Sequence, residues 1–83
     1  MESMKVVVKL FASYHKLLPA GSVHGKFEVD LPSGTTLADL MSRYQVPLTE
    51  DSVFLVNGLT PASLEQELFD GDTVAAFSAM AGG

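Results

Sequence analysis

The chain has 83 residues, with 47% hydrophobic and 18% charged side chains, a formal net charge of −5 and no cysteine. This composition predicts one globular domain over residues 1–83, and it excludes disulfides, iron–sulfur clusters, zinc–cysteine sites and thiol nucleophiles. No apolar run is long enough to span a membrane, the N-terminus lacks a signal-peptide pattern, and the acidic charge disfavours nucleic-acid binding, so we expect a cytoplasmic protein that binds neither membrane nor nucleic acid.

Alternating apolar and polar residues predict strands at Met4 to Phe11 and at Lys26 to Leu31. The connection over residues 12–25 is too long for a tight hairpin. Apolar residues at helical spacing predict a short helix in it, ended by Pro19-Ala20-Gly21. The residues expected to face the core in these segments are Val6, Val8, Leu10, Tyr14, Leu17, Leu18, Phe27, Val29 and Leu31.

A main helix is predicted after the turn at residues 31–34. Thr35 or Thr36 can cap it, and Asp39 favours its N-terminus through the helix dipole. Pro47 stops the pattern, so we expect about nine or ten residues. The apolar stripe facing the sheet is Leu37, Leu40, Met41 and Tyr44.

The second half predicts a strand at Ser52 to Val56, a hairpin turn at Asn57-Gly58, a loop with a helical turn at Pro61 to Leu68, a turn at Asp70-Gly71-Asp72 and a last strand at Thr73 to Phe77. With one helix to cover one face, this order predicts an α+β fold of the β-grasp (ubiquitin-like) type. We expect a mixed sheet of about four or five strands, with the last strand parallel to the first at its centre.

Residues 78–83 are expected to form an extended tail that ends in Gly82-Gly83. Glycines have no Cβ, so such a pair can thread a narrow groove and present its carboxylate to a second protein. The alternative is an ordinary frayed terminus.

The acidic residues of the second half lead toward this tail. They are either solvated loop residues or a surface that steers the tail toward a basic partner. They are Glu50, Asp51, Glu65, Glu67, Asp70 and Asp72.

Several motifs together resemble the ubiquitin-like sulfur carriers, and most closely the small subunit of molybdopterin synthase. They are Leu10-Phe11-Ala12, Val56-Asn57-Gly58, Asp70-Gly71-Asp72-Thr73-Val74 and Gly82-Gly83. The resemblance implies that a ubiquitin-activating-like adenylyltransferase uses ATP to adenylate the Gly83 carboxylate, which then becomes a thiocarboxylate. The synthase large subunit would direct this sulfur into the dithiolene of molybdopterin, in molybdenum cofactor biosynthesis. The chain would bind no cofactor and would not be catalytic alone, but would act as the sulfur-donating subunit of a sulfurtransferase.

The resemblance also implies contacts with the large subunit through Phe77. If Val74 and Ala76 point inward, Phe77 lies on the outer face as an apolar anchor; the alternative puts Phe77 in the core and Val74 outside. The other residues expected to contact partners are Leu59, Ala79, Met80 and Ala81, with Gly82 beside the reacting Gly83.

Other functions stay open. Thiamine-pathway sulfur carriers share the fold and the glycine pair but join their first strands by a tight turn. A protein modifier would pass the activated Gly83 to a lysine amine, and a plain interaction module would need no tail chemistry. His15 and His24 have no nucleophile or carboxylate close in sequence, so we expect surface histidines and no metal site.

Overall fold

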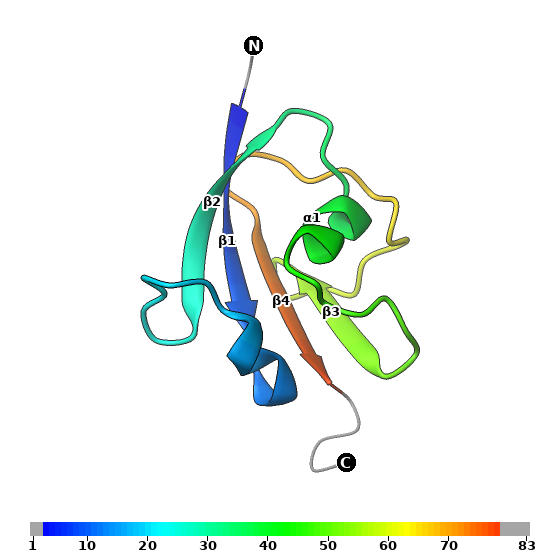
Figure 1. Ribbon diagram of the computed structural model, residues 1–83. Helices are drawn as coiled ribbons and strands as arrows, with labels where there is room; N and C mark the ends of the chain where they lie inside the picture. Colours follow the sequence, from blue (N-terminus) through cyan, green and yellow to red (C-terminus); the bar gives the residue numbers. More distant parts are fainter. Residues whose placement is uncertain (1–2, 79–83) are drawn as a thin grey trace.

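The computed structural model describes residues 3–78, in which a mixed sheet carries a helix across one face (Figure 1). The elements are β1 (Ser3–Leu10), the 3₁₀ helix η1 (Ala12–Leu17), β2 (Lys26–Pro32), α1 (Leu37–Arg43), β3 (Ser52–Val56) and β4 (Thr73–Ser78). The sheet has four strands in the order β2-β1-β4-β3. β1 and β4 are parallel, and the other neighbours are antiparallel. The predicted β-grasp fold, with its last strand beside its first, is confirmed.

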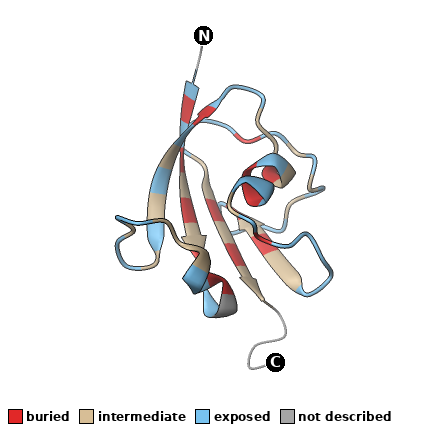
Figure 2. Ribbon diagram, viewed as in Figure 1, coloured by how far each residue is buried: buried red, intermediate tan, exposed pale blue. Residues whose placement is uncertain are grey.

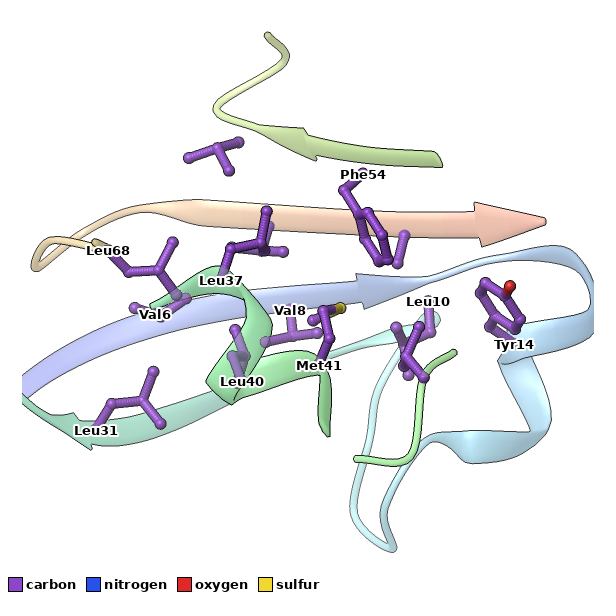
Figure 3. Close-up of a cluster of buried hydrophobic side chains, with 14 of the residues drawn as sticks. Val6, Val8, Leu10, Tyr14, Leu31, Leu37, Leu40, Met41, Phe54 and Leu68 are labelled. Carbon is purple, nitrogen blue, oxygen red and sulfur yellow. The ribbon is translucent and has the colours of Figure 1, made fainter. Parts of the chain in front are cut away.

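The core lies between the sheet and α1 (Figure 3). Val6, Val8 and Leu10 of β1 are fully buried on the helix side. Leu31 of β2 is also buried there, with Phe27 and Val29 packed against the same cluster. Figure 2 shows the alternation of buried residues along the central strands. The alternation predicted from sequence is therefore confirmed, and within residues 3–78 no helix covers the opposite face of the sheet.

The helix α1 has seven residues, so the prediction of nine or ten was wrong at its C-terminal end. The capping box predicts its start correctly: the Thr36 side chain accepts from Asp39 N–H, and the Asp39 carboxylate accepts from Thr36 N–H. A Schellman motif ends it before Pro47 can, with Gln45 at φ 65°. Val46 N–H donates to Met41 O at 2.9 Å, and Gln45 N–H donates to Ser42 O at 3.1 Å.

The long connection from β1 to β2 begins with η1, where a helix was expected. Tyr14 is buried, and its hydroxyl shares a hydrogen bond with Ser52 Oγ at the start of β3. Ser52 Oγ in turn donates to Pro47 O at 2.6 Å. The connection is therefore held to the core and to the start of β3, at the end of the sheet where β4 finishes.

The turn at residues 69–72 joins the start of β4 to β1. Gly71, at φ 89°, donates its N–H to Lys5 O at 2.8 Å, and Lys5 N–H donates to Asp70 Oδ1 at 2.8 Å. Val7 N–H donates to Asp72 O at 3.0 Å. Only glycine adopts this φ without strain, so the predicted turn also sets the register of the parallel pair.

A second set of bonds ties this turn to Asn57-Gly58. These two residues, at φ 54° and 82°, form the tight turn that was predicted, although the strand after it is reduced to one bridge between Val56 and Leu59. Asn57 Nδ2 donates to Asp72 Oδ1, and Asn57 Oδ1 accepts from Thr73 N–H, both at 2.9 Å. Asp72 Oδ2 accepts from Phe69 N–H at 2.9 Å. We call this pair of side chains the Asn57–Asp72 clasp.

Replacing Asp72 by alanine should lower the free energy of unfolding by about 1 to 3 kcal/mol, because Asn57 Nδ2 and Phe69 N–H lose a charged acceptor. The measurement is urea unfolding followed by circular dichroism. Glu65→Ala is the control, because the Glu65 side chain is exposed and only its N–H is hydrogen-bonded, so the change should stay within about 0.5 kcal/mol. Equal effects of the two variants would contradict the role of the clasp.

Candidate functional site

The candidate site is the carboxyl end of β4, which leads to the glycine pair. β4 is paired on both sides at this end: Leu10 of β1 lies opposite Ala76, and Ser52 of β3 lies opposite Ser78. Phe11 N–H donates to Ala76 O at 3.0 Å. The base of the tail is therefore fixed at the centre of the sheet. Ser78, assigned to the tail from sequence, is the last residue of the strand.

The other predicted tail residues lie outside the described residues. Their roles as the reacting group or as partner contacts stay predictions. They are Ala79, Met80, Ala81, Gly82 and Gly83.

Phe77 lies on the outer face of the sheet, away from α1. Val74 and Ala76 are fully buried, so the alternation puts Ala75 and Phe77 on the opposite face, as predicted. Phe77 is half-buried beside its partner Val53 on β3. An aromatic ring on an uncovered sheet face is suited to docking against another protein.

Leu59 is exposed but lies away from Phe77. β3 runs antiparallel to β4, so Val53 is paired with Phe77 at one end and Val56 with Val74 at the other. Leu59 follows the turn beyond Val56 and belongs to that second end. Leu59 and Phe77 thus occupy opposite ends of the β3–β4 pair, and Leu55 and Ala75 lie between them on the outer face.

The charges are arranged differently from the expectation that acidic residues lead to the tail. Most of the acidic group precedes β4, at the end away from Ser78: Glu65, Glu67, Asp70 and Asp72. Only Glu50 and Asp51, just before β3, lie near the end where β4 finishes. Lys9 and Lys26 face each other across β1 and β2, and Lys9 is also paired with Ala75. Lysines as well as carboxylates therefore lie near the base of the tail, and most of the acidic group lies at the other end of β4.

His15 and His24 are exposed, as expected, and line one shallow hollow with Phe11 and Gly25. Within residues 3–78, no three His, Cys, Asp or Glu side chains gather closely enough to hold a metal ion. In the same residues, no helix is long and apolar enough to cross a membrane.

Sequence reasoning passed over Phe69, whose side chain is exposed. A phenylalanine directly before a turn motif has no strand alternation to predict its direction. Its N–H donates to the Asp72 carboxylate, a contact that forms only once the turn has folded.

Comparison with known proteins gives a consistent picture. The sequence profile of the ThiS family matches residues 8–83. Putative molybdopterin converting factor subunit 1 from Pyrococcus furiosus is 31% identical, with a TM-score of 0.70 over 90% of this chain and 97% of that chain. The small archaeal modifier protein SAMP1 from Haloferax volcanii is 26% identical, with a TM-score of 0.71 over 95% of this chain and 99% of that chain.

A chain in the complex of subunits 1 and 2 of molybdopterin-converting factor from Helicobacter pylori is 19% identical, with a TM-score of 0.60 over 96% of this chain and 100% of that chain. This last likeness is one of fold alone. A comparison with curated protein sequences found no significant match.

Replacing Phe77 by alanine should lower the free energy of unfolding by only about 1 kcal/mol, because its ring is half-buried on the sheet face opposite α1. Phe54→Ala is the matched comparison. The Phe54 ring is 7% exposed in the core, so its loss should cost about 3 to 5 kcal/mol. Urea unfolding of both variants checks this, and equal losses would mean that Phe77 supports the fold and is not free for docking.

Proposed function

The chain belongs to the ThiS family of ubiquitin-like sulfur carriers, and we propose that it carries sulfur as a thiocarboxylate on its C-terminal Gly83. The observation that supports this most directly is that the family match runs to residue 83 and so includes Gly82-Gly83. β4 leads toward this pair from the centre of the sheet. A tail on such a fixed base loses less entropy when it enters a partner's active site than one on a mobile base.

The proposed chemistry starts with activation of the Gly83 carboxylate. An ionised carboxylate resists attack by nucleophiles, and its oxygen is a poor leaving group. A ubiquitin-activating-like adenylyltransferase binds ATP, and the Gly83 carboxylate attacks its α-phosphate as pyrophosphate leaves. A sulfide ion, HS⁻, then attacks the acyl carbon, displaces AMP and loses its proton. Gly83 finally carries a C(=O)S⁻ group, which is itself a nucleophile. In this scheme ATP is held by the partner, and the chain needs no cofactor of its own.

We further propose molybdopterin biosynthesis as the pathway. The 31% identity over 97% of the Pyrococcus protein, which is named a putative molybdopterin converting factor subunit 1, supports this assignment. In the Helicobacter complex the partner of subunit 1 is subunit 2. This supports the corresponding large subunit of the synthase as the protein that receives the tail. Phe77 would be the apolar anchor of that contact, with Ala79, Met80 and Ala81 following the tail into the partner. The catalytic groups would belong to the partner, and the reaction would take place in the cytoplasm.

The second candidate function is that of a protein modifier. The 26% identity with SAMP1, which is named a modifier protein, supports this candidate. Activation of Gly83 would be the same, but a lysine amine would attack the acyl carbon and form an isopeptide bond. Thiamine biosynthesis is a weaker alternative, because the β1–β2 connection with η1 differs from the tight turn expected of that group.

Deleting Gly83, or adding one residue after it, should abolish sulfur loading and leave the unfolding temperature unchanged. The reacting carboxylate is then lost or displaced, while the β4 pairings that hold the strand remain. Loading by the adenylyltransferase of the same host can be read as retardation on an organomercurial gel, with Glu28→Gln, an exposed site on β2, as the control variant. Normal loading of the truncated chain would refute the proposal.

Deleting the gene in the native host should abolish molybdopterin-dependent enzyme activity. The intact chain should restore it, and the chain lacking Gly83 should not. Pterin analysis of the cells should show that the sulfur-free precursor accumulates. Unchanged molybdopterin levels in the deletion strain would exclude this pathway and leave the carrier chemistry itself open.

A further inference from the structure

A shallow hollow of about 630 Å³ lies beside the start of β4. Leu59 and Phe69, which line it, are the two most exposed large hydrophobic residues among residues 3–78, at 71% and 65%. Burying a side chain of this size gains about 1.5 to 3 kcal/mol, so leaving both in water is unfavourable for the free chain. Neither packs into the core, and the fold gives no reason for an apolar residue at either place.

The backbone under both side chains is held firmly. Phe69 N–H donates to the Asp72 carboxylate, and the neighbouring Leu68 is buried. Leu59 exchanges backbone hydrogen bonds with Val56 at 3.1 and 2.8 Å. A partner that covers the hollow would therefore order little backbone, which keeps the entropic cost of binding low.

The charge of the hollow restricts what can cover it. Glu65, Glu67 and Asp72 line it, and no Lys, Arg or His does. Both Asp72 oxygens already accept bonds from Asn57 and Phe69, so Glu65 and Glu67 are the carboxylates free to face a partner. Nucleic acids and anionic membranes are repelled by this rim. A second copy in a symmetric pair would set Glu65 and Glu67 against their own counterparts.

The position of the hollow separates it from the site described above. β4 has six residues, and the five steps of about 3.3 Å between them put its start and its end about 17 Å apart. The hollow lies at the start, while Phe77 and the tail lie at the end. A protein bound to the hollow therefore leaves the tail free to enter another active site.

We propose that this hollow is a docking site for a partner protein that presents an apolar side chain flanked by lysine or arginine, and that this partner holds the carrier while a second protein works on the tail. The apolar side chain packs on Phe69 and Leu59, and the cations face Glu65 and Glu67. The surface is distinct from the outer face around Phe77. The proposal does not depend on which chemistry occurs at Gly83.

The test places the photo-crosslinking residue p-benzoylphenylalanine at position 69 of the full chain in its native host. After irradiation, the crosslinked peptide is sequenced by mass spectrometry. We expect one predominant partner, crosslinked through a segment in which Lys or Arg flanks an apolar residue. The same photo-residue at Val23, which is 58% exposed and lines a different hollow, controls for nonspecific capture.

Charge reversal supplies the second arm of the test. Glu65→Lys with Glu67→Lys should lower the crosslink yield from position 69 about tenfold, because like charges then face the partner. Glu28→Lys with Asp30→Lys is the matched control, since both residues are exposed on β2 and the net charge changes equally. Circular dichroism confirms that each variant is folded, and a gel assay of sulfur loading tests Gly83 separately.

The proposal is overturned by any of four results. Position 69 captures no protein above the level of Val23, it captures a second copy of this chain, or its crosslink is unaffected by reversal at Glu65 and Glu67. A partner segment without Lys or Arg would also contradict it. Loss of sulfur loading with an unchanged crosslink would leave the docking site standing and concern only the tail.

Discussion

The turn at residues 69–72 brings the start of β4 into register beside β1, and every other feature of the molecule follows from that pairing. Gly71 N–H donates to Lys5 O there, and Lys5 N–H donates to the Asp70 carboxylate. The Asn57–Asp72 clasp ties β3 to the same point. A parallel pair has no tight turn to align it, so its register has to come from contacts between distant segments. These turn residues therefore have a structural role, because they fix the register of the strand that leads to the tail.

Once β4 is central, its two faces and two ends acquire different properties. Val74 and Ala76 complete the core under α1, while Phe77 faces outward beside Val53. The carboxyl end leads to the glycine pair and has lysines near it on the sheet. The amino end carries most of the acidic group and the hollow around Phe69. β4 thus separates the end proposed for sulfur transfer from the hollow proposed for docking.

Local chemistry explains which features could be predicted from the sequence. Period-two alternation and turn dipeptides identify β1, β2 and the Asn57-Gly58 turn, because these features depend on neighbours in the chain. The helix is shorter than its apolar stripe suggests, because Gln45 takes a left-handed conformation. Glutamine, unlike glycine, does not predict a left-handed residue at the end of a helix. Three features could not be predicted: the position of the acidic residues at the start of β4, the Asn57–Asp72 clasp and the hollow. Each depends on segments that come together only in the folded sheet.

The central claim is that Gly83 carries sulfur, and the intact mass of the chain isolated from its native host tests it most directly. The account predicts a population in which one oxygen at the C-terminus is replaced by sulfur, and fragmentation should locate the change at Gly83. An unmodified chain accompanied by covalent adducts to lysines of larger proteins would contradict the carrier assignment and favour the modifier function.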